Sequence, residues 1–126
     1  MNPDAEGTTY PYVPFVVEPA RVAAFREVVG QADGVPPTFV TAAEFSVMPL
    51  VIADPNLGLD FAKVVHGSQE YVYERPLVEG ETLTVRTRIG SIRERAGAGF
   101  LTLVTELRDA DDALVCTARS LMVERA

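Results

Sequence analysis

The sequence has little of what disulfides, metal sites and acid–base chemistry usually require. It contains one cysteine, one histidine and no tryptophan. Because Cys116 has no partner within the chain, no internal disulfide can form, and we interpret this residue as a small part of the core. Asp54, Asp60 and the acidic run at 109–112 stand where turns favour aspartate and lack the spacing of metal ligands. We therefore expect no metal and no cofactor.

Positive charge is also scarce. Only 11 residues are basic against 18 acidic ones, which gives a formal net charge of −7 and an isoelectric point near 4.6. Proteins that follow the phosphates of nucleic acids, or that bind anionic membranes, carry the opposite balance. The composition therefore predicts neither a nucleic-acid partner nor a membrane partner.

Long apolar runs are missing too. The most apolar window, residues 35–53, is interrupted by prolines and by Glu44, and no run reaches the roughly 18 apolar residues that a membrane-spanning helix needs. The first ten residues have neither the basic nor the apolar region of a secretion signal. We expect a cytoplasmic protein. Its 126 residues match the size of one domain, 1–126, in which residues 1–9 form a flexible arm.

The first half of the chain predicts an edge strand and a short helix. Residues 9–17 are aromatic and β-branched but contain Pro11 and Pro14, which suits an edge strand or an extended arm and not a central strand. Pro19 then favours the first turn of a helix that Gly30 ends. Between them, apolar residues recur at helical spacing: Val22, Phe25, Val28 and Val29.

The segment from Thr38 to Ile52 predicts the central helix. Its apolar residues lie on nearly every side of a helical wheel, which is typical of a helix enclosed by other structure. Thr38 is the expected N-cap, and Pro49 is expected to kink or shorten the last turns.

The second half of the chain reads as four strands separated by turn residues. Alternation is clearest where Leu83, Val85 and Ile89 share one face, and it recurs at Leu101, Leu103 and Leu107. The expected strands are 66–75, 82–93, 100–108 and 114–124. A long antiparallel sheet wrapped around one apolar helix follows from this order, which is the α+β architecture known as the hot-dog fold.

Four sequence motifs then carry a resemblance to a known family. They are Val35-Pro-Pro-Thr-Phe39, Asp54-Pro-Asn-Leu-Gly-Leu-Asp60, Val65-His-Gly-Ser-Gln-Glu70 and Arg75-Pro-Leu-Val-Glu-Gly-Glu-Thr-Leu83. Over residues 10–125 the chain resembles the N-terminal group of MaoC-type dehydratases. Within that group it is most similar to the small, non-catalytic, substrate-binding subunits of actinobacterial (3R)-hydroxyacyl thioester dehydratases. The resemblance implies hot-dog domains that pair side by side, with an acyl thioester of CoA or acyl carrier protein lying along the interface.

One family feature is missing. In the catalytic relatives, an Asp and a His in a loop of the type D-x-N-P-x-H follow the first helix and perform the acid–base chemistry. At the corresponding place this chain has Asp33 without the following Asn-Pro-x-His. Because proton transfer needs groups within hydrogen-bond reach of the substrate, the resemblance implies that a partner subunit supplies them.

Two other residues form a reserve catalytic pair, Glu44 and His66. Glu44 interrupts an apolar helix, where an ionised carboxylate without partners is costly, so it is either a catalytic group or a neutralised or half-exposed glutamate. His66 is the only imidazole, and it either contacts the thioester or is a structural histidine of the sheet.

Substrate binding is assigned to two groups of residues. The first group is Pro37, Thr38 and Phe39 at the start of the central helix, where the backbone amides near Thr38 and Phe39 could polarise a thioester carbonyl. Gly67 and Gln69 belong to the H-G-x-Q motif. Tyr71 and Tyr73, in contrast, are interpreted as sheet and interface packing.

Three functional hypotheses follow. The first is an acyl-thioester-binding subunit of a heteromeric (3R)-hydroxyacyl dehydratase or enoyl hydratase, with a catalytic MaoC-like chain as its partner. The second is a self-sufficient homodimeric dehydratase or thioesterase that uses Glu44 and His66. The third is a homodimer that binds a ligand without catalysis.

Overall fold

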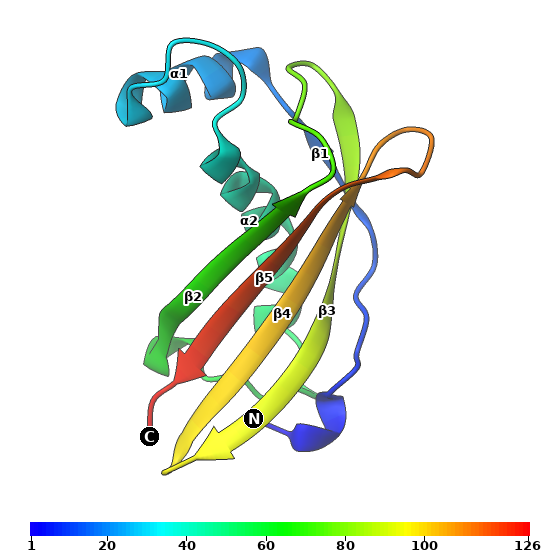
Figure 1. The fold of residues 1–126 in the computed structure, drawn as a ribbon. Coiled ribbons are helices and arrows are strands. Elements are labelled where there is room, and N and C mark those ends of the chain that lie inside the picture. The colour runs from blue at the N-terminus through cyan, green and yellow to red at the C-terminus, as the bar shows by residue number, and fades with distance from the viewer.

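Four strands from the second half of the chain and one short strand near its start form a curved antiparallel sheet, and the helix between residues 41 and 52 lies against its concave face (Figure 1). A computed structural model describes all residues, 1–126. The strands are β1 (Val13–Val16), β2 (Val64–Tyr73), β3 (Thr82–Arg95), β4 (Ala98–Arg108) and β5 (Leu114–Glu124). Their order in the sheet is β1-β3-β4-β5-β2, with every neighbouring pair antiparallel. The predicted hot-dog architecture is confirmed.

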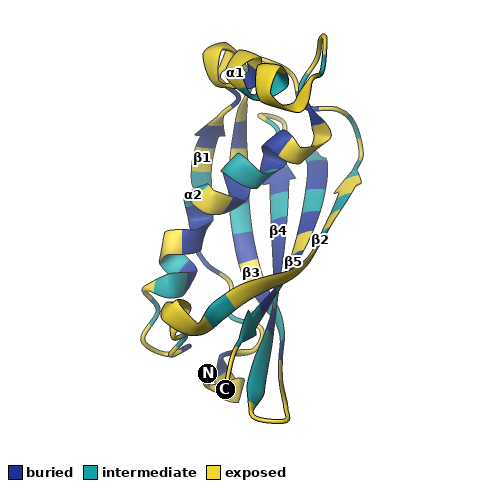
Figure 2. Ribbon diagram, turned by 90° about the vertical axis from the view of Figure 1, so that its left-hand side faces the viewer, coloured by how far each residue is buried: buried dark blue, intermediate teal, exposed yellow.

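Two α-helices complete the fold. α1 (Pro19–Val29) sits across one end of the sheet and buries only Val22, while α2 (Thr41–Ile52) runs along the concave face (Figure 2). As expected, Gly30 ends α1 in the left-handed conformation that glycine adopts without strain. Neither helix has the length and apolar character of a membrane-spanning segment.

The core follows the predicted alternation. All six alternating residues of β3 and β4, from Leu83 to Leu107, are at most 2% exposed and pack toward the helix. Cys116 is a free, buried thiol on the same inner face. β1 pairs only with β3, at the sheet edge, as its prolines predicted.

The start of the central helix differs from the prediction. Residues Pro37–Val40 form a separate turn of 3-10 helix, and α2 begins only at Thr41. Thr38 therefore lies within this turn and does not cap α2, whose first residue is preceded by Val40 without a side-chain cap. Pro49 does not end the helix, which continues to Ile52.

The prediction that the central helix is enclosed on all sides was wrong. Its inner face is buried, but Phe45 is 63% exposed on the side that looks away from the sheet, and Pro49 is exposed as well. A five-stranded sheet covers only one face of a helix, so the remaining apolar face is left open in the single chain.

The first nine residues lie against the sheet. Pro3–Ala5 form a 3-10 turn in which Ala5 is buried. The N–H of Gly7 donates to the carbonyl of Ile89, whose own N–H donates to Thr8, so the segment runs beside β3. The flexible arm expected here stays a prediction.

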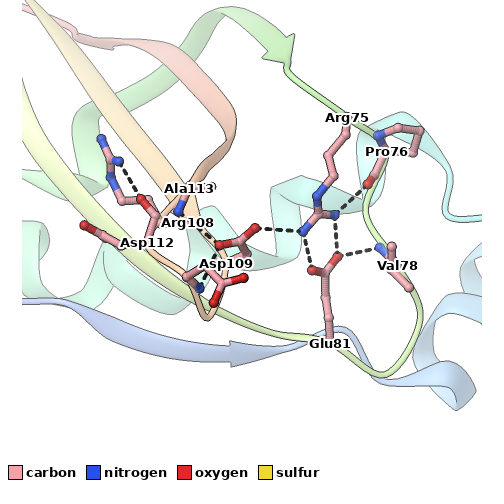
Figure 3. Close-up of polar contacts among 9 residues, drawn as sticks. Arg75, Pro76, Val78, Glu81, Arg108, Asp109, Asp112 and Ala113 are labelled. Atoms are coloured by element: carbon pink, nitrogen blue, oxygen red, sulfur yellow. Dashed lines mark hydrogen bonds and ion pairs between the residues drawn. The ribbon is translucent and has the colours of Figure 1, made fainter.

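The Arg-Pro-x-x-x-Gly-Glu motif closes the connection between β2 and β3. Figure 3 shows Arg75 between the carboxylates of Glu81 and Asp109. The guanidinium donates two hydrogen bonds to Glu81, of 2.7 and 3.0 Å, and the Val78 N–H donates to the same carboxylate. The tight turn also needs the positive φ of Gly80. This motif thus has a structural role, since it fixes the end of β2 against the next strand.

We expect replacement of Glu81 by glutamine to lower the free energy of unfolding by about 1 kcal/mol at neutral pH, a modest loss because Arg75 is a third exposed. Burial opposes ionisation of Glu81, but the hydrogen bonds from Arg75 and Val78 outweigh it and hold the pKa of this carboxyl below its ordinary value. The stabilisation is therefore fully present above the pKa of Glu81 in the unfolded chain, about 4.3. It is lost as the pH falls through the lower pKa that Glu81 has in the folded protein.

Urea denaturation at pH 7 and at about pH 3 measures this difference. The stability gap between wild type and Glu81→Gln should narrow at the lower pH. The neighbouring Glu79→Gln is the control, because Glu79 pairs with Arg26 at a more exposed site. A gap as large at pH 3 as at pH 7 would show that the ionised pair does not contribute.

Candidate functional site

A cavity of about 270 Å³ lies between α2 and the β2 edge of the sheet. One part of its wall is apolar and the other carries polar side chains. The lining residues are Phe45, Met48, Phe61, Val64 and Met122 on the apolar side, and Thr41, Glu44, His66, Gln69 and Ser120 on the polar side. No group of three or more His, Cys, Asp or Glu side chains is arranged to hold a metal ion.

Glu44 is the buried acid of this cavity. Its side chain comes from α2, is 5% exposed and forms no ion pair. Its Oε1 accepts from the Tyr71 hydroxyl at 3.2 Å, while Oε2 lies 3.1 Å from both Gln69 Nε2 and Ser120 Oγ. Burial raises the pKa of Glu44 above its ordinary value, and these hydrogen bonds offset only part of the effect.

Gln69 joins Glu44 to His66. Its Nε2 donates to Glu44, and its Oε1 lies 3.1 Å from His66 Nε2. Gln69 also contacts Ser120, which faces the cavity from the adjacent strand β5. The structure therefore brings together the reserve pair, Glu44 and His66, through one amide side chain.

A β-bulge makes this arrangement possible. His66 is opposite Met122 and Gln69 is opposite Ser120, so both residues face the helix although they are three positions apart. In a regular strand an odd spacing would put them on opposite faces. The register shifts between His66 and Ser68, at Gly67, where an added Cβ would come within 3.2 Å of the Leu121 side chain. Gly67 is absent from the cavity wall and acts on the site by setting this bulge.

The other predicted substrate-binding residues lie elsewhere. Pro37 borders a separate surface depression of about 390 Å³, where the Tyr73 hydroxyl donates to its carbonyl. Thr38 does not line the cavity either. Phe39 is 2% exposed and packs in the core against Phe15 and Phe25. Its side chain is therefore separated from the cavity.

The sequence interpretation missed three polar residues of this site: Thr41 and Ser120, which line the cavity, and Tyr71, which contacts Glu44. Tyr71 was assigned to packing, yet its hydroxyl contacts both Glu44 and Thr41. Ser120 is 4% exposed and interrupts the apolar inner face of β5, between Ala118 and Met122. A buried polar residue in an apolar row needs a partner, so the same argument that singled out Glu44 applies to Ser120.

A protein-family model described as "FAS1-like, dehydratase domain region" matches residues 5–118. The chain belongs to this family. A UPF0336 protein of Saccharopolyspora erythraea is 36% identical over 86% of this chain, which spans 66% of that relative. A UPF0336 protein of Streptomyces coelicolor is also 36% identical, with 95% of this chain and 92% of the relative aligned.

A solved structure of the same architecture is similar over nearly the whole chain. It is the C-terminally truncated HadBC (3R-hydroxyacyl-ACP dehydratase) complex of Mycobacterium tuberculosis, with a TM-score of 0.82. The alignment covers 98% of this chain and 99% of the matched one at 23% identity, which supports a shared fold. The expected resemblance to MaoC-like hot-dog dehydratases is confirmed.

Within this dehydratase family, the position of Asp33 is informative. Asp33 lies in the turn-rich connection after α1 and is not among the residues that line the cavity. The titratable side chains of the cavity are Glu44 and His66. Acid–base chemistry inside this chain's own cavity therefore has only these two groups to use.

Proposed function

We propose that this chain is an acyl-thioester-binding subunit of a (3R)-hydroxyacyl-CoA or -ACP dehydratase, paired with a second hot-dog chain that supplies the catalytic acid and base. The observation that carries the proposal is the place of the cavity, which lies beside the free edge of the sheet. A ligand bound there would lie next to whatever chain covers that edge.

The free edge has the character of an interface. β2 pairs only with β5, so the outer main-chain groups of its ten residues have no partner strand. Such edges are normally covered or charged in a protein that stays monomeric. Here large apolar residues are exposed along and beside the edge instead: Phe45, Phe61, Val65 and Val72, each at least 46% exposed.

The division of chemistry between two chains is supported by the missing loop. The sequence lacks Asn-Pro-x-His after Asp33, and the structure has only a short connection between α1 and the 3-10 turn at Pro37. The similar solved structure is that of a 3R-hydroxyacyl-ACP dehydratase complex. A heteromeric assembly of this kind would bring the missing acid and base to the cavity from the partner.

The test is to purify the tagged chain from its native host and to identify stoichiometric partners by mass spectrometry. The expected result is a second small hot-dog chain that carries the D-x-N-P-x-H sequence, and a complex that hydrates an enoyl thioester. Recovery of the chain alone, with hydratase activity, would contradict the division of labour.

A homodimeric dehydratase or thioesterase is the second candidate, and one observation favours it. Gln69 connects Glu44 and His66 in a single hydrogen-bonded group at the cavity wall. If these residues carry the chemistry, Glu44→Gln abolishes turnover of the isolated chain without loss of the fold. The control is Glu70→Gln, on the outward face of β2 next to Gln69, which should leave turnover unchanged. Turnover that survives Glu44→Gln would reject this candidate.

A further inference from the structure

The orientation of the Gln69 amide can be assigned from its surroundings. One side-chain atom lies 3.2 Å from the backbone carbonyl of Arg119, which can only accept, so this atom is the nitrogen. Its second hydrogen then points to Glu44 Oε2. The Gln69 oxygen is left as an acceptor, and it faces both His66 Nε2 and Ser120 Oγ.

These two contacts fix two more hydrogens. Because an amide oxygen cannot donate, His66 must carry a hydrogen on Nε2. For the same reason, the single hydroxyl hydrogen of Ser120 points to Gln69 Oε1. The two lone pairs of the amide oxygen are then both used.

The remaining contact concerns Glu44 itself. Ser120 Oγ lies 3.1 Å from Glu44 Oε2, but its only hydrogen is already directed to Gln69. With that hydrogen directed to Gln69, the contact with Glu44 is a hydrogen bond only if the carboxyl group supplies the hydrogen. Glu44 would then be a neutral acid that donates from Oε2 and accepts the Tyr71 hydroxyl at Oε1. This agrees with its burial, and every polar side-chain atom that is buried in the chain has a partner.

We propose that this hydrogen-bond network fixes the tautomer of His66 and makes it a hydrogen-bond acceptor for the hydroxyl group of a bound 3-hydroxyacyl ligand. In the network, Glu44 donates to Ser120, and Ser120 and His66 both donate to the Gln69 amide oxygen. His66 is thereby held with its hydrogen on Nε2 and a free lone pair on Nδ1. Gln69 and Ser120 are positioning residues, which act through His66. The inference rests on the proposed acyl-thioester binding.

The proposal adds a ligand preference to that function. His66 is exposed in the free chain, so solvent can satisfy Nδ1 there, and a bound acyl chain that displaces this solvent must offer a donor in its place. The 3-hydroxyacyl group has such a donor, while the saturated acyl group of the same length has none. A site with a placed hydrogen-bonding group discriminates against the ligand that lacks the matching one.

The hydrogen positions can be tested without a ligand. We expect the carboxyl carbon of Glu44 to have the ¹³C shift of a protonated acid throughout the range from about pH 5.5 to 7, where an ordinary glutamate is ionised. In wild type, the ¹⁵N shifts of neutral His66 should show hydrogen on Nε2. In the variants Gln69→Met and Ser120→Ala, which interrupt the hydrogen-bond network at different points, they should show a mixture of tautomers. An ionised Glu44 at pH 6, or hydrogen on Nδ1 in wild type, would overturn the inference and leave acyl binding untouched.

The ligand preference needs a second experiment with the complex as purified from its host. Calorimetry with 3-hydroxyacyl- and saturated acyl-pantetheine thioesters of equal length should give about tenfold tighter binding of the hydroxyacyl form. His66→Phe should remove this ratio, Gln69→Met should reduce it, and Glu70→Gln should keep it. Equal affinities in wild type would contradict the inference alone, whereas no binding of either thioester would contradict the proposed function as well.

Discussion

Replacing Phe39 by alanine is expected to lower the free energy of unfolding by about 3 to 5 kcal/mol, the loss typical of a buried aromatic side chain. The ring is 2% exposed and packs edge-on against Phe25 with centroids 5.5 Å apart, and against Phe15 at 6.2 Å. It thus joins α1, the 3-10 turn before α2 and strand β1 in one part of the core. Chemical denaturation of the variant measures the loss.

Phe45→Ala is the matched control. The same chemical change is made only six residues away, but this ring is 63% exposed and lines the cavity. We expect a change of less than about 1 kcal/mol in the stability of the single chain, with weaker binding of acyl thioester. If Phe39→Ala kept wild-type stability and lost ligand binding instead, Phe39 would be a substrate-binding residue and not a core residue.

The architecture was predictable because it depends on local patterns. Apolar alternation at period two fixes which face of β3 and β4 is buried, whatever the partner strand is. The strand predicted at 114–124 coincides with β5, since turn residues mark its start. Prolines excluded residues 9–17 from the centre of the sheet, and β1 is an edge strand.

The site was only partly predictable because it depends on contacts between distant segments. Glu44 stood out as a charged residue in an apolar helix, but the sequence left open whether it is buried or half-exposed, and the structure shows it 5% exposed. Its partner Ser120 is 76 positions away, and no local pattern pairs the two. Only the packing of α2 on the sheet brings them together.

The bulge at Gly67 shows most clearly what local sequence patterns cannot predict about the site. Simple alternation places His66 and Gln69 on opposite faces of β2, and the extra residue reverses this. The register of an irregular strand is set by its neighbour, here β5, and not by its own sequence alone. Gly67 was therefore recognised as part of a motif, but its contribution to the site required the structure.

The second large effect is expected at the free edge of the sheet. The double variant Val65→Lys and Val72→Lys should weaken association with the partner chain by about tenfold. Both side chains lie on the outward face of β2 and are 46% and 51% exposed, so the fold of the single chain should tolerate lysine. In an assembled sheet a partner strand would lie beside β2, and lysine at these positions would lose the apolar cross-strand contacts that valine makes there.

The matched control is Val28→Lys with Val29→Lys, at the end of α1. These valines are also exposed, at 86% and 48%, and receive the same added charge, but they end α1, which sits across one end of the sheet and not along β2 (Figure 2). Sedimentation velocity on the purified assembly distinguishes the two variants. Because both add two positive charges to a chain of net charge −7, a general electrostatic effect would weaken both alike. Loss of assembly only in the β2 variant places the partner on the edge beside the cavity, whereas loss only in the α1 variant would move the interface away from the cavity and remove the main support for a shared site.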